Sequence, residues 1–287
     1  MPEKREVIII GAGPAGLSAA LTLRARGREV CVLSLDSGGS GLYKASKIEN
    51  YPGMPDVSGA GMLETMTAQA LSAGAELLDG RVIAVSPIKR GYFVSLGQQV
   101  LETKAIILCT GAAQSKQYPG EAEFLGRGVS YCATCDGMLY RNKRVAVIGM
   151  NEEAIREAEF LKSIGCELYF YTTPGKILPE TPGIEFLRAR EFEIIGGEFV
   201  TALVADGAET AVDGVFILRN SIAMSVLLSG LKLTYNHIAV GRGMETNLPG
   251  VFAAGDCTGK PYQIAKAVGE GNVAALSADE YIADTAM

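Results

Sequence analysis

Histidine is nearly absent from this 287-residue sequence, which contains only His237. No apolar run approaches the roughly 20 residues that cross a membrane, and the charged stretch Met1–Glu6 does not resemble a signal peptide. Low-complexity segments are missing too, and 48% of the residues are apolar, which is typical of a compact globular protein. The length is sufficient for one large domain or two ordinary ones.

Basic residues are fewer than acidic ones, with 26 Lys and Arg against 32 Asp and Glu and a net charge of −6. This balance argues against nucleic acid as a partner. The six cysteines include one closely spaced pair, so they do not form the disulfide framework of a small secreted protein. We therefore expect a cytoplasmic protein with no membrane segment. The cysteines are Cys31, Cys109, Cys132, Cys135, Cys166 and Cys257.

Cys132 and Cys135 form the close pair, in the stretch Cys-Ala-Thr-Cys-Asp, with Asp136 directly after the second cysteine. A Cys-x-x-Cys pair is found in zinc sites as well as in redox disulfides. Zinc requires four ligands, and the sequence offers one histidine and no second cysteine pair. We therefore predict no metal site and interpret the pair as a redox disulfide beside a carboxylate that can move a proton.

The sequence 7–21 predicts a dinucleotide-binding turn. Val7–Ile10 is an apolar run typical of a buried parallel strand, and Gly11-Ala-Gly13-Pro-Ala-Gly16 follows before apolar residues at helical spacing. The glycines of such a turn permit the tight bend, the approach of a pyrophosphate and the packing of the helix on the strand. The next strand, 29–34, ends without the acidic residue typical of NAD sites, which favours FAD.

Further ligand-binding segments are expected at loops and at the ends of two other strands. The loops at 38–42 and 48–53 are rich in glycine and proline, and the strand at 105–109 ends at Thr110-Gly111. The strand at 251–254 ends at Gly255-Asp256. Asp256 is expected either to bind a ribose or ribitol hydroxyl or to cap a helix.

Several motifs together resemble the low-molecular-weight thioredoxin reductases of the flavoprotein disulfide reductase superfamily. The resemblance covers the full length of the chain and is most specific at CATCDG. The motifs are GAGPAG at 11–16, ENYPG at 49–53, TGA at 110–112, PGE at 119–121, GRGVSYCATCDG at 126–137, and GVFAAGD at 250–256 followed by Gln263.

This resemblance implies an α/β fold of two Rossmann-like domains, the second inserted into the first. Residues 1–113 and 242–287 are expected to form the FAD-binding domain, and residues 114–241 the pyridine-nucleotide-type domain with the cysteine pair. It also implies a homodimer and thioredoxin as the protein substrate. The expected FAD-binding residues are Gly11, Gly13, Pro14, Ala15, Gly16, Leu42, Asn50, Thr110, Gly111, Gly255, Asp256, Gln263 and Ile264.

The resemblance also implies roles at the cysteine pair. Cys135 is expected to be the thiol nearest the flavin, Cys132 to attack the disulfide of thioredoxin, and Asp136 to act as general acid and base. These roles agree with thiol chemistry, because the thiolate is the reactive species and exchange proceeds through a mixed disulfide.

The second βαβ unit departs from the family pattern. After the strand at 144–149, the family usually has Gly-x-Gly-x-x-Ala, and this sequence has Gly149-Met-Asn-Glu-Glu-Ala154. Asn151 places a side chain where the backbone would approach a pyrophosphate. Glu152 and Glu153 place two negative charges at the helix end that would attract phosphate. The motif therefore predicts a lost nucleotide site.

The next strand, 168–171, supports the same interpretation. It leads into Thr172-Thr-Pro-Gly175, where NADPH-using members of the family have an arginine cluster, and no arginine lies between Arg156 and Arg188. Lys176 is a single flexible charge. This pattern resembles the ferredoxin-dependent flavin thioredoxin reductases, so reduced ferredoxin is the expected electron donor. An atypical NAD(P)H site or a deazaflavin donor remains the alternative.

Two other functional classes would share the fold and the cysteine pair. A flavin-bound redox sensor would not need Asp136, and a dithiol oxidase acting on small substrates would use oxygen as acceptor.

An acidic ferredoxin requires a basic face on this acidic chain, although clusters of basic residues are commonly solvated surface. The candidate clusters are Arg141, Lys143 and Arg144, and Arg24, Arg26 and Arg28.

Overall fold

A computed structural model describes residues 2–34, 42–97, 99–111, 117–175, 178–179, 181–218 and 227–285. The chain divides into two compact units. Unit 1 combines the two chain ends, Met1–Gln114 and Leu227–Met287, and unit 2 is the intervening segment Ser115–Val226. The expected α/β class, with one Rossmann-like unit inserted into another, is confirmed.

The second junction lies earlier in the chain than expected. We placed it between residues 241 and 242, but unit 1 already resumes at Leu227. The reason is a set of hydrogen bonds within the returning segment: Lys232 N donates to Asn247 Oδ1 at 2.8 Å, and Asn247 Nδ2 donates to Gly230 O at 2.9 Å. The first junction was expected between residues 113 and 114, which lie outside the described residues.

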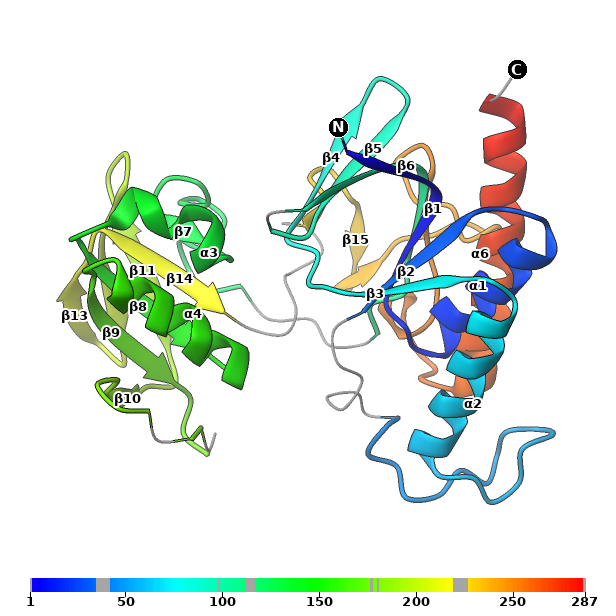
Figure 1. Ribbon diagram of the computed structural model, residues 1–287, viewed down its shortest axis with the longest axis horizontal. Helices are drawn as coiled ribbons and strands as arrows, with labels where there is room; N and C mark the ends of the chain where they lie inside the picture. Colours follow the sequence, from blue (N-terminus) through cyan, green and yellow to red (C-terminus); the bar gives the residue numbers. More distant parts are fainter. Residues whose placement is uncertain are drawn as a thin grey trace. The chain divides into compact units, whose positions relative to one another are not determined.

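Unit 1 is built on a mostly parallel sheet in the order β3-β2-β1-β6-β5-β4, with β17 beside β6. Strands β1, β2, β3, β6 and β17 are parallel, whereas β4 and β5 form an antiparallel edge (Figure 1). The apolar runs of the sequence therefore became central strands. The strands are β1 (Glu3–Ile10), β2 (Val30–Ser34), β3 (Glu76–Asp79), β4 (Ala84–Ile88), β5 (Gly91–Ser95), β6 (Val100–Leu108) and β17 (Val251–Ala253).

Helices α1 (Pro14–Ala25) and α6 (Ile264–Thr285) pack side by side against this sheet (Figure 1). Their close approach depends on Gly271, where an added Cβ would lie 2.1 Å from the backbone oxygen of Ala15. The α1–α6 contact joins the N-terminal and C-terminal parts of unit 1. The remaining elements are α2 (Gly59–Ser72), the 3₁₀ turn η3 (Asp256–Thr258) and the hairpin of β15 (Leu233–Thr234) and β16 (His237–Ile238).

Unit 2 has a parallel sheet in the order β10-β9-β8-β14-β7 and a separate antiparallel sheet of β11, β12 and β13. Helix α4 follows β8, and the short α3 and η2 follow β7. The elements are β7 (Val129–Ser130), α3 (Ala133–Asp136), η2 (Gly137–Tyr140), β8 (Arg144–Gly149), α4 (Glu152–Ser163), β9 (Glu167–Thr172), β10 (Phe186–Arg188), β11 (Phe192–Gly196), β12 (Val200–Ala205), β13 (Ala208–Ala211) and β14 (Gly214–Leu218).

Each unit has its own hydrophobic core. In unit 1 the core lies between the sheet and the three helices, with Ile9, Leu17 and Ile107 fully buried. In unit 2 a second core forms between α4 and the parallel sheet, with Phe216 and Leu161 fully buried. The two cores share no residue, so each unit has its own source of stability.

Candidate active site

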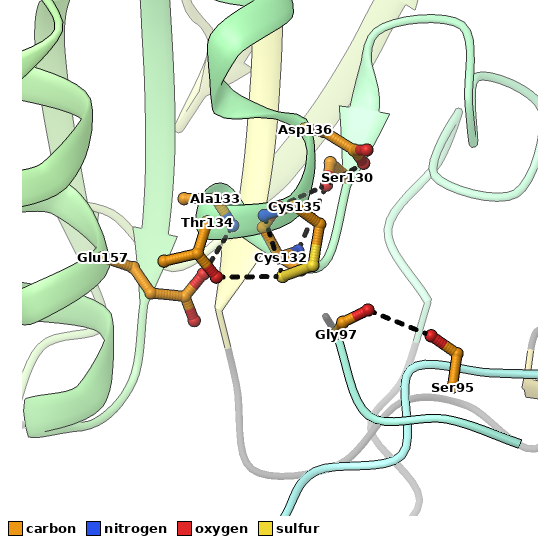
Figure 2. The surroundings of a disulfide bond; sticks show 9 residues. All are labelled: Ser95, Gly97, Ser130, Cys132, Ala133, Thr134, Cys135, Asp136 and Glu157. Carbon is orange, nitrogen blue, oxygen red and sulfur yellow. Dashed lines mark hydrogen bonds between the residues drawn. A yellow bond between two sulfur atoms is a disulfide. The ribbon is translucent and has the colours of Figure 1, made fainter. Parts of the chain in front are cut away.

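Cys132 and Cys135 form a disulfide with an S–S distance of 2.01 Å at the start of α3 (Figure 2). Cys132 is the N-cap residue of this short helix, and its sulfur accepts a hydrogen bond from Cys135 N at 3.2 Å. The Thr134 hydroxyl lies 3.3 Å from the same sulfur. Two donors thus converge on Cys132 Sγ, and in the reduced pair such donors stabilise a thiolate.

Asp136 is held by Ser130, a residue for which the sequence analysis assigned no role. Ser130 Oγ lies 2.7 Å from Asp136 Oδ2, and the same hydroxyl accepts a hydrogen bond from Cys132 N at 3.1 Å (Figure 2). Ser130 is buried at the end of β7. Its side chain therefore connects the expected acid and base to the backbone of the first cysteine. The serine two residues before the cysteine pair was the sequence feature that could have indicated this contact.

Glu157 is a second residue that the sequence analysis missed. Its side chain extends from α4, and its Oε2 accepts a hydrogen bond from Ala133 N at 2.5 Å (Figure 2). The signal was present in the helical spacing, because Glu157 lies three residues after Ala154 and four before Leu161, both of which are buried. An acidic residue on the apolar face of a helix requires a partner.

The glycine turn of unit 1 has the expected geometry for a dinucleotide. An added Cβ at Gly11, which has φ +114°, would lie 2.2 Å from Cys109 O, and one at Gly16 would lie 1.9 Å from Gly11 O. Gly13 differs, because a Cβ there would meet no atom within 4 Å. Gly13 is also the N-cap of α1 and brings no side chain to the first amides of the helix. Its open space and these amides suit a pyrophosphate.

The other expected cofactor residues lie at the same edge of the unit 1 sheet. Gly11 follows β1, Thr110 follows β6 and Gly255 follows β17, and these parallel neighbours end side by side. An added Cβ at Gly255 would lie 3.0 Å from the Cβ of Ala15, which places the end of β17 against the start of α1. Ligands of open α/β sheets bind at this carboxyl edge.

Asn50 and Gln263 are hydrogen-bonded to each other, with Asn50 Nδ2 donating to Gln263 Oε1 at 3.0 Å. Leu42 packs against the unit 1 core, and Ile264 begins α6. Burial raises the pKa of Asp256, while Lys266 lowers it and Glu270 raises it further. The side chain is therefore partly desolvated, as expected for one that binds a ligand hydroxyl. All the predicted FAD-binding residues lie in unit 1, and their arrangement fits FAD.

The corresponding turn of unit 2 is closed by its own side chain. Asn151 is the N-cap of α4, and its Oδ1 accepts a hydrogen bond from Ala154 N at 2.8 Å. Glu152 and Glu153 occupy the first turn of the helix. Asn151 therefore binds an amide of the kind that a phosphate would otherwise contact. Lys176, the single charge expected after β9, lies outside the described residues.

The remaining cysteines are buried thiols outside the redox pair. Burial raises the pKa of Cys31 to about 12 and that of Cys257 to about 11, and it raises the pKa of Cys109 as well. Cys257 Sγ donates to Leu108 O at 3.3 Å. A high pKa keeps a thiol protonated and unreactive, so the Cys132–Cys135 pair remains the candidate for redox chemistry.

The two basic clusters differ in their surroundings. In the Arg24, Arg26 and Arg28 cluster, Arg28 Nε contacts Asp279 Oδ1 at 2.6 Å and Arg26 lies 3.7 Å from the same carboxylate. Two arginines of that cluster are therefore paired with a carboxylate. Arg141, Lys143 and Arg144 are exposed. Within the described ranges, three or more potential metal ligands do not gather at any point, and no helix is long and apolar enough to span a membrane.

Known proteins resemble this chain over nearly its whole length. Residues 5–271 match the family model described as pyridine nucleotide-disulphide oxidoreductase. The chain is 38% identical to the thioredoxin reductase of Aquifex aeolicus (strain VF5), over 96% of this chain and 93% of the relative. A solved ferredoxin-flavin thioredoxin reductase from Clostridium acetobutylicum is 38% identical, with a TM-score of 0.89 and 99% of both chains covered. A thioredoxin reductase from Gloeobacter violaceus is 31% identical, with a TM-score of 0.79 over 98% of this chain and 95% of that one.

Proposed function

Because this chain belongs to the pyridine nucleotide-disulphide oxidoreductase family and, within it, to the thioredoxin reductases, we propose that it reduces the disulfide of thioredoxin with electrons from reduced ferredoxin. The observation that carries the choice of donor is the N-terminus of α4. There Asn151 caps the helix and two glutamates occupy its first turn, where a nicotinamide nucleotide would need free amides and no negative charge.

FAD is the cofactor, and we assign it to unit 1. The residues that would hold it are the Gly11–Gly16 turn for the pyrophosphate, Asp256 for a hydroxyl of the ribitol or ribose, and the hydrogen-bonded pair of Asn50 and Gln263. The chemistry that bound FAD would supply is the conversion of one-electron donation into two-electron reduction of the disulfide. Both chain ends contribute to this site, which agrees with the proposed division into a discontinuous flavin domain and an inserted domain.

The thiol chemistry is proposed to follow from the order of the cysteines. In the reduced pair, the Cys132 thiolate attacks one sulfur of the thioredoxin disulfide, forms a mixed disulfide and releases the other sulfur as a thiolate. The Cys135 thiolate then attacks Cys132 Sγ, which re-forms the Cys132–Cys135 disulfide and releases dithiol thioredoxin. Asp136, positioned by Ser130, supplies and removes the protons of these steps.

The proposal also concerns the donor, the oligomeric state and the location of the protein. The similarity to the Clostridium acetobutylicum ferredoxin-flavin thioredoxin reductase supports ferredoxin as the donor. We also propose a homodimer, on the family resemblance alone. A cytoplasmic location agrees with four free, buried cysteines outside the redox pair.

An anaerobic turnover experiment tests the donor. The purified flavoprotein receives reduced ferredoxin, NADPH, NADH or a reduced deazaflavin in separate series, and both flavin absorbance and thioredoxin thiols are measured. We expect ferredoxin to bleach the flavin and to yield one reduced thioredoxin for every two ferredoxins oxidised. The Cys135→Ser variant is the control, because its flavin remains reducible while thioredoxin stays oxidised. Rapid bleaching and turnover with NADPH or NADH would overturn the proposal.

A further inference from the structure

Glu157 is a charged side chain in a place where charges are rare. Only 7% of the residue is exposed, and it sits on the face of α4 that packs on the unit 2 core. Buried carboxylates are costly unless hydrogen bonds satisfy them. Ala133 N provides such a bond at 2.5 Å, and Ala133 itself is fully buried. The carboxylate is therefore fixed against the helix that carries the redox pair.

The hydrogen bond between Ala133 N and Glu157 lies at the N-terminal end of α3, where the Cys132 sulfur also lies. Cys132 is the N-cap residue, and Ala133, which follows it, is the first residue of the helix. The Cys135 amide and the Thr134 hydroxyl contact Cys132 Sγ and favour a thiolate there. An ionised carboxylate at Glu157 would act in the opposite direction, because like charges in a partly buried site repel.

Asp136 is the other carboxylate of this segment, and its surroundings differ. Its Oδ2 is bound by the Ser130 hydroxyl. Glu157 extends from a different element, α4, and accepts a hydrogen bond from the backbone of α3 at Ala133. Each acid therefore has a hydrogen bond of its own, Asp136 with the Ser130 hydroxyl and Glu157 with Ala133 N.

We propose that Glu157 is a positioning residue that holds the first turn of α3 and, through its charge, lowers the reduction potential of the Cys132–Cys135 pair. A thiolate at Cys132 exists only after the disulfide accepts two electrons, so a nearby carboxylate destabilises the reduced form relative to the disulfide. A reduced pair that is less stable is a stronger reductant. Glu157 thus favours the transfer of the electron pair onward to the thioredoxin disulfide.

This effect of Glu157 on the pair depends on the disulfide and its neighbours and not on the electron donor. It is the same whether NADPH, a deazaflavin or ferredoxin reduces the flavin. The corresponding experiment requires neither donor nor thioredoxin, so its failure is distinguishable from a failure of the proposed function.

Glu157→Gln separates the charge from the contact. The glutamine oxygen still accepts the Ala133 N–H bond, but the negative charge is gone. The matched control is Glu159→Gln, which removes the same charge from an exposed position of the same helix. The flavoprotein variants are equilibrated with dithiothreitol buffers of graded redox ratio and quenched. The thiols of Cys132 and Cys135 are then quantified by peptide mass spectrometry.

We expect the equilibrium constant for reduction of the pair in Glu157→Gln to rise about tenfold, which corresponds to about 30 mV for a two-electron couple. The control should change by less than about twofold, since an exposed charge is screened. Alkylation of Cys132 in the reduced variant should also reach its half-maximal rate at a lower pH. A potential for Glu157→Gln equal to that of the wild type and of Glu159→Gln would overturn the proposal.

Glu157→Ala removes both the charge and the contact. If it unfolds unit 2, the comparison of Glu157→Gln with Glu159→Gln still decides the question, because the glutamine preserves the hydrogen bond. A destabilised Glu157→Ala together with an unchanged Glu157→Gln would show that the residue is purely structural and would contradict the charge effect.

Discussion

Asp136 is the proposed general acid and base of the redox site. It follows Cys135 and is bound by Ser130, whose hydroxyl also accepts the amide hydrogen of Cys132. Proton transfer by a positioned carboxylate contributes about 10² to 10⁴ in rate. The serine therefore fixes the acid beside the pair without being part of the Cys-x-x-Cys pattern.

Asp136→Asn should lower the kcat for thioredoxin reduction by about 10²-fold, because the amide keeps the hydrogen bond with Ser130 but cannot move a proton. The disulfide and the bound flavin should be unchanged. Steady-state assays with thioredoxin give the rate, and thiol counting gives the state of the pair. Asp284→Asn, at an exposed position of α6, is the control for loss of one charge. Normal turnover in Asp136→Asn would assign the proton transfer to another group.

The strand-turn-helix elements that contain α1 and α4 have different N-cap residues. In α1 this residue is Gly13, which leaves open space beside the first amides. In α4 it is Asn151, whose side chain binds Ala154 N. The same local fold thus leaves amides available to a dinucleotide in unit 1, whereas in unit 2 a side chain already binds one of them.

Asn151→Ala should destabilise α4 by about 1 kcal/mol, the usual effect of losing an N-cap side chain. Hydrogen exchange of the α4 amides measures this change within unit 2. Asn151→Asp is the matched control and should exchange like the wild type, because aspartate caps equally well. Equal exchange in Asn151→Ala and the wild type would mean that the side chain does not support the helix.

The edge strand β3 is held by an ion pair that crosses β2. Arg5 Nε and Nη2, from β1, bind the two carboxylate oxygens of Glu76 at 2.6 and 3.1 Å. The hydrogen bond from Arg5 lowers the pKa of Glu76, while partial burial opposes this change. A lowered pKa in the folded state stabilises the protein above the unfolded-state value, and this stability is lost as pH falls through the folded-state value.

Glu76→Gln should lower the free energy of unfolding at neutral pH by about 0.5 kcal/mol, as is typical of a partly exposed pair. The difference from wild type should disappear as the pH falls below the ordinary glutamate value of 4.5. Urea denaturation at graded pH provides the measurement, with the exposed Glu64→Gln as control. A difference that persists in acid would show that packing, rather than charge, supports β3.

The sequence predicted the elements more reliably than the contacts between them. The strands expected at 7–10, 144–149 and 251–254 became β1, β8 and β17, because a mainly apolar run is buried on both faces of a parallel sheet. The contacts of Ser130 and Glu157 with the redox segment could not be predicted, since they depend on tertiary packing. The hairpin of β15 and β16 was not predicted, because it turns through Tyr235 and Asn236, which have positive φ without the usual glycine.

At the scale of the whole molecule, the chain is two units with separate cores. The proposed FAD contacts come from both chain ends but from unit 1 alone, whereas the redox pair, Asp136 and Glu157 belong to unit 2. A ligand stabilises the part of a protein that forms its site. Binding of FAD should therefore be detectable as a property of one unit.

Removal of FAD should lower the melting temperature of unit 1 by about 5 to 10 °C and leave unit 2 unchanged. A ligand at about 100 times its dissociation constant stabilises the folded state by about 2.7 kcal/mol. For a unit of this size, each kcal/mol raises the melting temperature by about 2 to 4 °C. Calorimetry records the transitions, and hydrogen exchange assigns each to its unit. Added FAD should restore the transition, whereas riboflavin, which lacks the pyrophosphate, should not.

Gly13→Ala makes this prediction specific to the pyrophosphate. An alanine Cβ at position 13 meets no atom within 4 Å, and the backbone φ of −82° suits any residue, so the apoprotein should melt like the wild type. The methyl group fills the space reserved for the ligand, so FAD should raise the unit 1 transition by less than in the wild type. An equal rise in Gly13→Ala, or a loss of FAD that lowers the melting temperature of unit 2 instead, would place the cofactor outside the Gly11–Gly16 turn.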